Sequence, residues 1–223
     1  TGSTHLVPEA LLREAMEAGH ELGVAAAELL RSGKVLPASM WVELVVAAIG
    51  VGGGSGSYVV EGFPEDAPTL EAFEGALGCG VALCVRLDCD EETLASRLEG
   101  RSSAEAWDFF DETEREASAE SVGRRQRLFA SSSAAVSSAL AGGGRLRVVD
   151  ASSGSASDVA SRVEGVLSGM GAPGWVPTPL SPTVVCVLGA AGSGRSMACA
   201  VAASSTGSTH LVPEALLREA MEA

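Results

Sequence analysis

The residues with the clearest chemical pattern lie at 189–196 and read GAAGSGRS. They fit the phosphate-loop pattern GxxxxGK[ST] at every fixed position but one. In such a loop, glycines let backbone N–H groups converge on phosphate oxygens, and the dipole of the following helix favours the anion. The predicted phosphate ligands are Gly189, Gly192, Ser193, Gly194, Arg195 and Ser196, and Ser196 is also the predicted Mg²⁺ ligand.

The departure from the pattern is Arg195, which stands where the pattern has lysine. A planar guanidinium is bulkier than an ammonium and cannot replace it beneath the β- and γ-phosphates. We therefore expect phosphate binding to survive better than catalysis. The alternative is a glycine turn that binds no ligand. The context favours the phosphate loop, because the apolar run TVVCVL precedes it and the helical segment MACAVAASS follows it.

The rest of the chain alternates short apolar segments with helical ones, which predicts an α/β fold with a parallel sheet covered on both faces. A tract rich in proline and glycine at 168–182 predicts a linker. The predicted strands cover 58–60, 81–87, 146–149 and 183–188, and the predicted helices cover 8–18, 21–31, 38–49, 69–77, 90–101, 112–140 and 158–167.

The chain also repeats itself: residues 1–18 return letter for letter as residues 206–223, an offset of 206 − 1 = 205 positions. This period is too long for a solenoid unit and has the size of a whole domain. The favoured interpretation is a tandem array of near-identical domains. This chain would then be cut out of phase with the domain, so that a domain boundary lies inside it. The alternative is an artificial duplication of a short segment.

Several motifs, in order along the chain, resemble those of the adenylate kinase family of nucleoside-monophosphate kinases. The ordered set is more specific than any one motif and covers essentially the whole period. The matching segments are 4–13 (THLVPEALLR, against THLSTGDLLR), 33–37 (GKVLP, against GxLVP), 58–65 (YVVEGFPE, against FLIDGFPR), 97–101 (RLEGR, against RLxxR), 120–125 (ESVGRR, against ETIKKR) and 149–159 (against VNAxxxxxxV).

The resemblance implies a P-loop three-layer sandwich with a five-stranded parallel sheet, an AMP-side helical subdomain and a lid. Residues 1–167 would then form a domain that lacks its first strand and P-loop. After the linker at 168–182, residues 183–223 would supply the first strand, the P-loop and the start of the next, or a circularly permuted, domain. If 183–205 folds back onto the domain, the second copy of the repeat is expected to have no place in it.

The resemblance also assigns roles to residues that keep the family pattern. Arg13 and Gly62 would lie at the AMP side, with Arg13 on the AMP phosphate. Arg97 and Arg101 would stack on adenine and hold phosphate. Arg125 would reach the transferred phosphate. The implied catalytic residues are thus Arg195, Arg101 and Arg125.

Other positions depart from the family. Glu65 replaces an arginine that would meet the AMP phosphate, and a like charge there is unfavourable. Glu61 replaces the aspartate of the implied Mg²⁺ site and is one methylene longer. Thr69 replaces the glutamine that reads adenine, and the lid segment 102–116 keeps one arginine. Each lost phosphate-stabilising group costs about 10²–10³ in rate, so a degenerate pseudoenzyme is expected, damaged more on the AMP side.

Composition narrows the functions further. The formal charge of −14 argues against nucleic-acid and anionic-membrane partners. The longest apolar runs are too short to span a bilayer. Five cysteines without a CxxC pair suit a reducing, cytoplasmic compartment, and with only three histidines a histidine-based metal or catalytic centre is not expected.

Three functions remain open. The favoured one is a structural repeat module of a large assembly, contacting neighbouring repeats and other subunits. Because proteins with several such domains are typical of cilia and flagella, the resemblance implies an axonemal location. The alternatives are a divergent active kinase that converts ATP and AMP to two ADP, and a non-catalytic nucleotide sensor that binds ATP with Mg²⁺.

Overall fold

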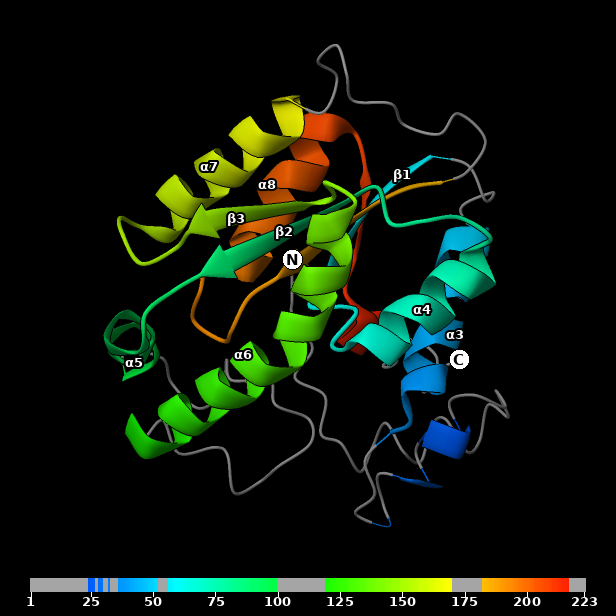
Figure 1. Cartoon of the computed structure of the whole chain (residues 1–223), viewed down its shortest axis with the longest axis horizontal. Helices are drawn as coiled ribbons and strands as arrows, with labels where there is room; N and C mark the ends of the chain where they lie inside the picture. Colours follow the sequence, from blue (N-terminus) through cyan, green and yellow to red (C-terminus); the bar gives the residue numbers. More distant parts are fainter. Residues whose placement is uncertain are drawn as a thin grey trace, which may run out of the picture.

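The computed structural model describes residues 24–26, 28–29, 32, 36–51, 56–99, 119–169 and 182–216. Five parallel strands form one sheet in the order β3-β2-β4-β1-β5 (Figure 1). The predicted fold class, an α/β fold with a five-stranded parallel sheet, is confirmed. The strands are β1 (Ser57–Glu61), β2 (Leu83–Asp88), β3 (Leu146–Asp150), β4 (Thr183–Leu188) and β5 (Thr209–Leu211).

The helices cover both faces of this sheet. Figure 1 shows α7 and α8 together on one side, with α4 and α6 on the other. No helix among the described residues is long and apolar enough to cross a membrane. The helices whose two ends lie within the described residues and that pack around the sheet include α3 (Ala38–Val51), α4 (Ala67–Leu77), α5 (Glu91–Glu99), α6 (Ala119–Gly142), α7 (Ala156–Ser168) and α8 (Arg195–Thr206).

Local sequence explains where several helices begin. Asp90 accepts a hydrogen bond from the backbone N–H of Thr93 at 2.7 Å and so caps the start of α5. Ser155 and Asp158 form a reciprocal capping box at the start of α7. At α8 the N-cap is Gly194, which offers no side-chain cap, so the first turn of this helix is left open for other acceptors.

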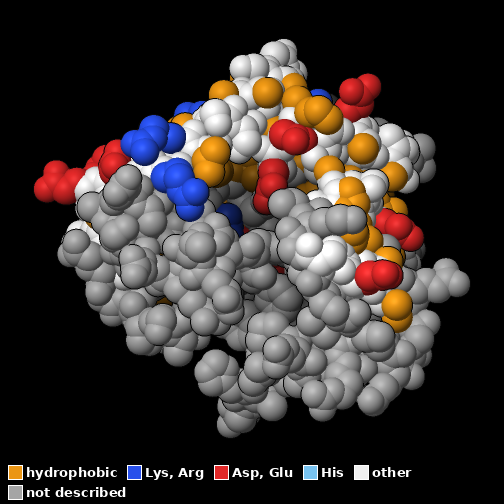
Figure 2. Space-filling model, turned by 90° about the horizontal axis from the view of Figure 1, so that it is seen from below, with side chains coloured by type: hydrophobic (Ala, Val, Ile, Leu, Met, Phe, Trp, Pro, Cys, Tyr) orange, Lys and Arg blue, Asp and Glu red, His pale blue; other side chains and the backbone are white. Residues whose placement is uncertain are grey.

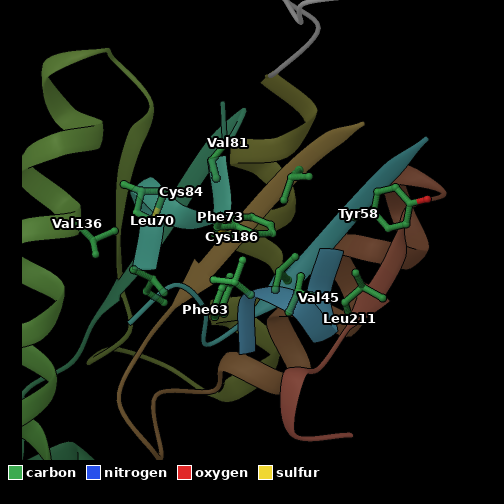
Figure 3. Close-up of a cluster of buried hydrophobic side chains, with 14 of the residues drawn as sticks. Val45, Tyr58, Phe63, Leu70, Phe73, Val81, Cys84, Val136, Cys186 and Leu211 are labelled. Atoms are coloured by element: carbon green, nitrogen blue, oxygen red, sulfur yellow. The ribbon is translucent and has the colours of Figure 1, made fainter. Parts of the chain in front are cut away.

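The core consists of two hydrophobic clusters, one on each face of the sheet, because successive side chains along a strand point to opposite faces. In β4, Val184, Cys186 and Leu188 join the cluster packed under α3, α4 and α6, part of which Figure 3 shows. Val185 and Val187 point the other way, to the cluster under α7 and α8. Burial on both faces explains why the central strand is a continuous apolar run.

The strand β5 corrects one expectation. It comprises Thr209–Leu211, which belong to the second copy of the repeat, and it pairs with β1 at the edge of the sheet. Leu211 is 5% exposed and lies in the cluster under α3 and α4. The expectation that this copy has no place beside a folded-back 183–205 is therefore wrong. The first copy, residues 1–18, lies outside the described residues.

Candidate functional site

The phosphate loop follows the central strand β4 and leads directly into α8, as predicted. Gly192 and Gly194 have φ values of +87° and +86°, a region that residues with a Cβ rarely adopt. At Gly189, a Cβ would lie 2.5 Å from Ser193 Oγ, so this close approach also requires glycine. The glycines of the motif thus serve the loop conformation that the sequence pattern predicts.

Ser193 is the most enclosed side chain of the loop. It is fully buried, and its Oγ has no hydrogen-bond partner among the described residues. A buried hydroxyl without a partner costs about 1–3 kcal/mol. This cost marks the loop as a place where a ligand or a water molecule could supply a hydrogen bond.

Arg195, the residue in the lysine position, is half-buried and bonded to other residues of the site. Its Nε donates to Glu61 Oε1 at 3.2 Å, and its Nη1 donates to the carbonyl oxygen of Gly189 at 2.9 Å. The guanidinium lies so close to Gly62 that a Cβ there would meet it at 3.0 Å. Arg195 therefore neutralises the Glu61 carboxylate of β1, and its bond to Gly189 connects the two ends of the phosphate loop.

Glu61 is the hub of this site. It is 3% exposed, and its Oε1 also accepts a hydrogen bond from Ser196 Oγ at 2.5 Å. Its Oε2 faces His210 Nε2 at 3.1 Å. Burial by itself raises the pKa of Glu61, but the hydrogen bonds from His210 and Ser196 and the charge of Arg195 outweigh burial and lower the pKa to about 2.

The two residues predicted to hold Mg²⁺, Ser196 and Glu61, are therefore in direct contact. However, the Glu61 oxygen that Ser196 contacts is already paired with the Arg195 guanidinium. A cation at that oxygen would lie beside another positive charge, which is unfavourable. These contacts do not fit a Mg²⁺ ion at Oε1.

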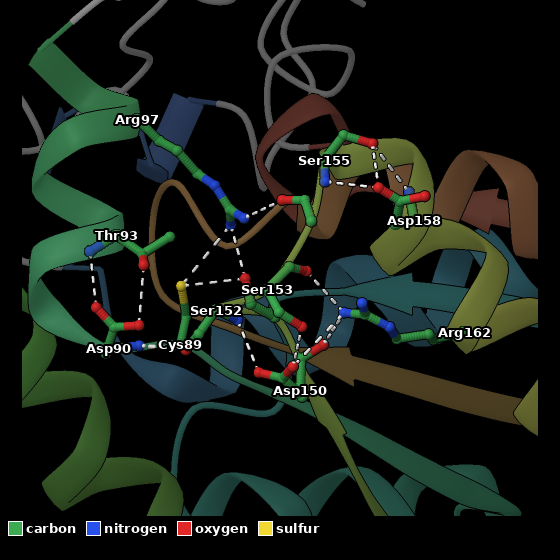
Figure 4. A network of polar contacts seen from close by, with 12 residues as sticks. Cys89, Asp90, Thr93, Arg97, Asp150, Ser152, Ser153, Ser155, Asp158 and Arg162 are labelled. Atoms are coloured by element: carbon green, nitrogen blue, oxygen red, sulfur yellow. Dashed lines mark hydrogen bonds and ion pairs between the residues drawn. The ribbon is translucent and has the colours of Figure 1, made fainter.

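Figure 4 shows that Arg97, from α5, reaches toward the segment between β3 and α7. Its Nη1 donates to the carbonyl oxygen of Ala151 at 2.8 Å and, more weakly, to that of Gly192 at 3.4 Å, and its Nη2 donates to Gly154 at 2.9 Å. It thus ties α5 to the phosphate loop and to the loop between β3 and α7. The roles that the resemblance implies for Arg97, stacking on adenine and holding phosphate, stay predictions.

A cavity of about 390 Å³ lies next to this region, between the loop after β1 and helix α6. Figure 2 shows the face of the molecule on which acidic and basic side chains both border a central hollow. None of the described residues that line the cavity is a lysine or an arginine. They are Pro64, Glu65, Leu128, Phe129, Ser131, Ser132, Ser133 and Leu188.

Glu65 supplies the carboxylate of this cavity. Although Glu65 is an exposed residue, the partial burial of its carboxyl group raises its pKa. The nearby charges of Glu214 and Asp66 raise the pKa further, and Arg195 acts in the opposite direction. Glu214 and Asp66 thus add negative charge near the position that the resemblance assigns to a phosphate ligand, and Arg195 offsets part of it.

Several predicted residues are not part of this geometry. Arg125 lies within α6, and its side chain is not among those described. Arg13, Arg101 and the lid segment 102–116 lie outside the described residues. Thr69, expected at the adenine-reading position, donates its backbone N–H to Asp66 Oδ1 at 2.8 Å, and Asp66 is the N-cap of α4.

Two neighbours of Glu61 were missed by sequence reasoning. His210 reaches it from β5, and Cys199 reaches it from α8. The available signal was the alternation in the predicted strand at 58–60, which puts Glu61 on the same face as Val59. The pairing of Val59 with His210 could not be anticipated, because no strand was predicted at 209–211.

Comparisons with known proteins give a distant relationship to nucleoside-monophosphate kinases. UMP-CMP kinase 3 of Oryza sativa subsp. japonica is 27% identical over 132 residues, which cover 59% of this chain and 58% of that protein. UMP-CMP kinase 3 of Arabidopsis thaliana is 27% identical over 150 residues, 67% of this chain and 69% of that protein. An adenylate kinase of Xanthomonas campestris pv. campestris is 27% identical over 162 residues, 71% and 82% of the two chains.

The chain thus spans less than two thirds of the rice protein that it matches. No protein-family profile matches it, and no solved structure gives a significant match. The relationship agrees with the five-stranded parallel sheet and the phosphate loop after its central strand.

Proposed function

We propose that this chain is a nucleoside-monophosphate-kinase-like module that does not transfer phosphoryl groups and serves a structural role in a larger assembly. The observation that carries the proposal is the cavity beside the phosphate loop. A monophosphate entering it would meet the Glu65 carboxylate and the hydroxyls of Ser131–Ser133, without a cation from the described lining. Phosphoryl transfer depends on positive charge around the transferring group, so this lining opposes it.

The triphosphate side supports the same conclusion in a different way. The only cation at the lysine position, Arg195, is bonded to Glu61 and to the carbonyl oxygen of Gly189. It would have to leave both partners to reach a phosphate. Freeing it would leave the Glu61 carboxylate buried beside fewer partners, which is costly. Arg195 therefore acts in the fold more readily than on a phosphate.

Nucleotide binding without transfer is the second candidate, and the phosphate loop favours it. The glycine conformations, the uncapped start of α8 and the buried hydroxyl of Ser193 fit the phosphates of ATP. Gly189, Gly192, Ser193, Gly194 and Ser196 would hold these phosphates, and Arg97 would lie beside them. In this role the chain would be a nucleotide sensor whose ligand changes its contacts with neighbours.

The partners of the structural module are proposed to be neighbouring repeats of the same protein and other subunits. The letter-for-letter repeat of 1–18 at 206–223 supports an array. A place in a ciliary or flagellar axoneme is proposed from the resemblance to proteins with several such domains. A net charge of −14 favours protein partners over nucleic acid.

The test of the structural role is the structure of the native complex that contains the full-length protein. The proposal expects this domain to bury large surfaces against its neighbours, whether or not nucleotide is present. A domain that hangs free in the complex would contradict it. Calorimetric titration with ATP then separates the two candidates, because a purely structural module gives no binding heat and a sensor gives a saturable one.

A further inference from the structure

Three potential metal ligands converge behind the phosphate loop, from three different elements. Glu61 lies at the end of β1, His210 lies in β5 and Cys199 lies in α8. Because Val59 pairs with His210 and alternate residues share a face, Glu61 and His210 both project to the side of the sheet that α8 covers. Cys199 faces them from the first turns of α8.

The distances between the three ligand atoms are short. A carboxylate oxygen of Glu61, the Cys199 Sγ and a ring nitrogen of His210 all lie within 4.8 Å of one another. His210 Nε2 is 3.1 Å from Glu61 Oε2. Two such ligands of a tetrahedral zinc ion at the usual bond lengths lie about 3.3 Å apart, and sulfur and nitrogen ligands lie about 3.6 Å apart. Small side-chain movements would complete this geometry.

We propose that Glu61, Cys199 and His210 form a binding site for a divalent cation of the zinc type. A thiolate, an imidazole and a carboxylate together select zinc or a similar transition metal, whereas Mg²⁺ prefers oxygen ligands alone. Three protein ligands leave a fourth position for water or another ligand. The His210 side chain is 24% exposed, so it is the ligand of the three that solvent reaches most readily.

Metal binding changes the charge of the site. Coordination breaks the S–H bond of Cys199, and the proton leaves to solvent. The carboxylate and the thiolate together carry two negative charges, His210 binds as neutral imidazole, and with the Arg195 guanidinium the metal-bound site has a net charge of +1. Arg195 contacts the other oxygen of Glu61, Oε1, and keeps that ion pair. The site therefore does not require the guanidinium to move.

The proposal is independent of the proposed function, because none of its ligands has to contact a nucleotide. It differs from the Mg²⁺ site that the resemblance implies at Ser196 and Glu61. That site would use Glu61 Oε1, whereas the zinc-type site uses Oε2. Metal binding can therefore be measured in the absence of nucleotide.

The test is a metal titration of the purified, metal-free full chain under anaerobic conditions. With Co²⁺, we expect one ion per chain, with the ligand-field bands of tetrahedral cobalt and a thiolate-to-cobalt charge-transfer band. Zn²⁺ should displace Co²⁺ and abolish both, and Mg²⁺ should leave them unchanged. Failure to see the charge-transfer band, or displacement by Mg²⁺, would overturn the proposal.

Two substitutions locate the ion. Cys199→Ser should abolish the charge-transfer band, and His210→Gln should weaken Zn²⁺ binding more than about 100-fold, beyond the loss typical of outer-shell changes. Cys199 is fully buried, so its variant could fold poorly. His210 is more exposed, so His210→Gln is expected to fold, which circular dichroism checks. Its Zn²⁺ affinity then tests the site even if Cys199→Ser does not fold.

The chain offers a matched control for each variant. Cys79→Ser removes a half-buried cysteine elsewhere and should leave Zn²⁺ affinity unchanged. His5→Gln changes the identical position in the first copy of the repeat and should also have no effect. If His5→Gln weakens binding and His210→Gln does not, or if both Cys199→Ser and His210→Gln bind normally, the site is wrong.

Discussion

His210 Nε2 lies 3.1 Å from Glu61 Oε2, although 149 positions separate the two residues in the chain. The contact exists because β5 pairs with β1 in parallel register. It places the second copy of the repeat against the residue that also holds Arg195 and Ser196. The repeated segment is thus linked to the phosphate loop through Glu61.

The lowered pKa of Glu61 predicts a dependence of stability on pH. Its folded pKa of about 2 lies below the ordinary value of 4.5, so its ionised form stabilises the fold above about pH 4.5. This stabilisation, about 3 kcal/mol from the difference between the two pKa values, is lost as the pH falls from 4.5 towards 2.

The measurement compares urea unfolding of the unaltered chain and of Glu61→Gln. The unaltered chain should be the more stable at about pH 7, and its advantage should shrink by about 2 kcal/mol at about pH 3. Glu71→Gln, at an exposed position of α4, is the control and should show no such change. An advantage of Glu61 that stays constant with pH would contradict the hydrogen bonds and ion pair assigned to it.

The close approach of Arg195 to Gly62 predicts that alanine is poorly tolerated there. Gly62 has φ +70°, and a Cβ would lie 3.0 Å from the guanidinium. We expect Gly62→Ala to lower the free energy of unfolding by about 2–3 kcal/mol. Gly78→Ala is a matched control, because Gly78 has φ +69° and open space around it, and it should cost about 1 kcal/mol. If the two variants cost the same free energy of unfolding, the Arg195 guanidinium does not lie against Gly62 as described.

Much of this fold could be predicted from local sequence. β4 coincides with the predicted strand at 183–188. A strand that is buried on both faces is a continuous apolar run, so its two ends are visible in the sequence. Predicted and observed bounds differ more at β2, where strand was predicted from Val81 and begins at Leu83. The backbone N–H of Val81 donates to Glu74 Oε1 instead of joining the ladder.

The site could be predicted only in part. The phosphate loop is contiguous, so its glycines and Ser196 were visible as a motif. The partners of Glu61 were not, because His210 and Cys199 reach it through strand pairing and helix packing. A strand of three residues, Thr209–Leu211, carries too little alternation to be recognised. Its place depends on the edge that β1 leaves open.

The two copies of the repeat contain identical residues, so the same substitution can be made in each copy and its cost in stability compared. Leu211 is 5% exposed in the core beside β1, so Leu211→Ala should destabilise the chain by about 2–4 kcal/mol. Leu6 is the same residue in the first copy. We expect Leu6→Ala to cost much less, as measured by chemical denaturation. A larger cost for Leu6→Ala would mean that the first copy fills the edge of the sheet.

The negative charge at Glu65 predicts how monophosphate binding could be gained. Glu65→Arg should tighten AMP, UMP or CMP binding about 10–100-fold, the effect of a new charged hydrogen bond to phosphate. Glu65→Gln removes the negative charge without adding a donor and should give a smaller gain. Isothermal titration calorimetry measures both. Unchanged affinity in the arginine variant would show that the cavity beside Glu65 does not receive a phosphate.

The measurement that tests the central claim most directly is a phosphoryl-transfer assay. The purified chain is incubated with ATP and Mg²⁺, and with AMP, UMP or CMP in turn, and nucleoside diphosphate is measured by chromatography. The adenylate kinase of Xanthomonas campestris serves as the active control for AMP. Arg195 stands where active enzymes of the family have lysine, and Glu65 stands where they have arginine. Because each of these two losses costs about 10²-fold or more in rate, we expect turnover at least about 10⁴-fold below that of an active enzyme. Turnover within about tenfold of the active control, with any of the three acceptors, would contradict the account.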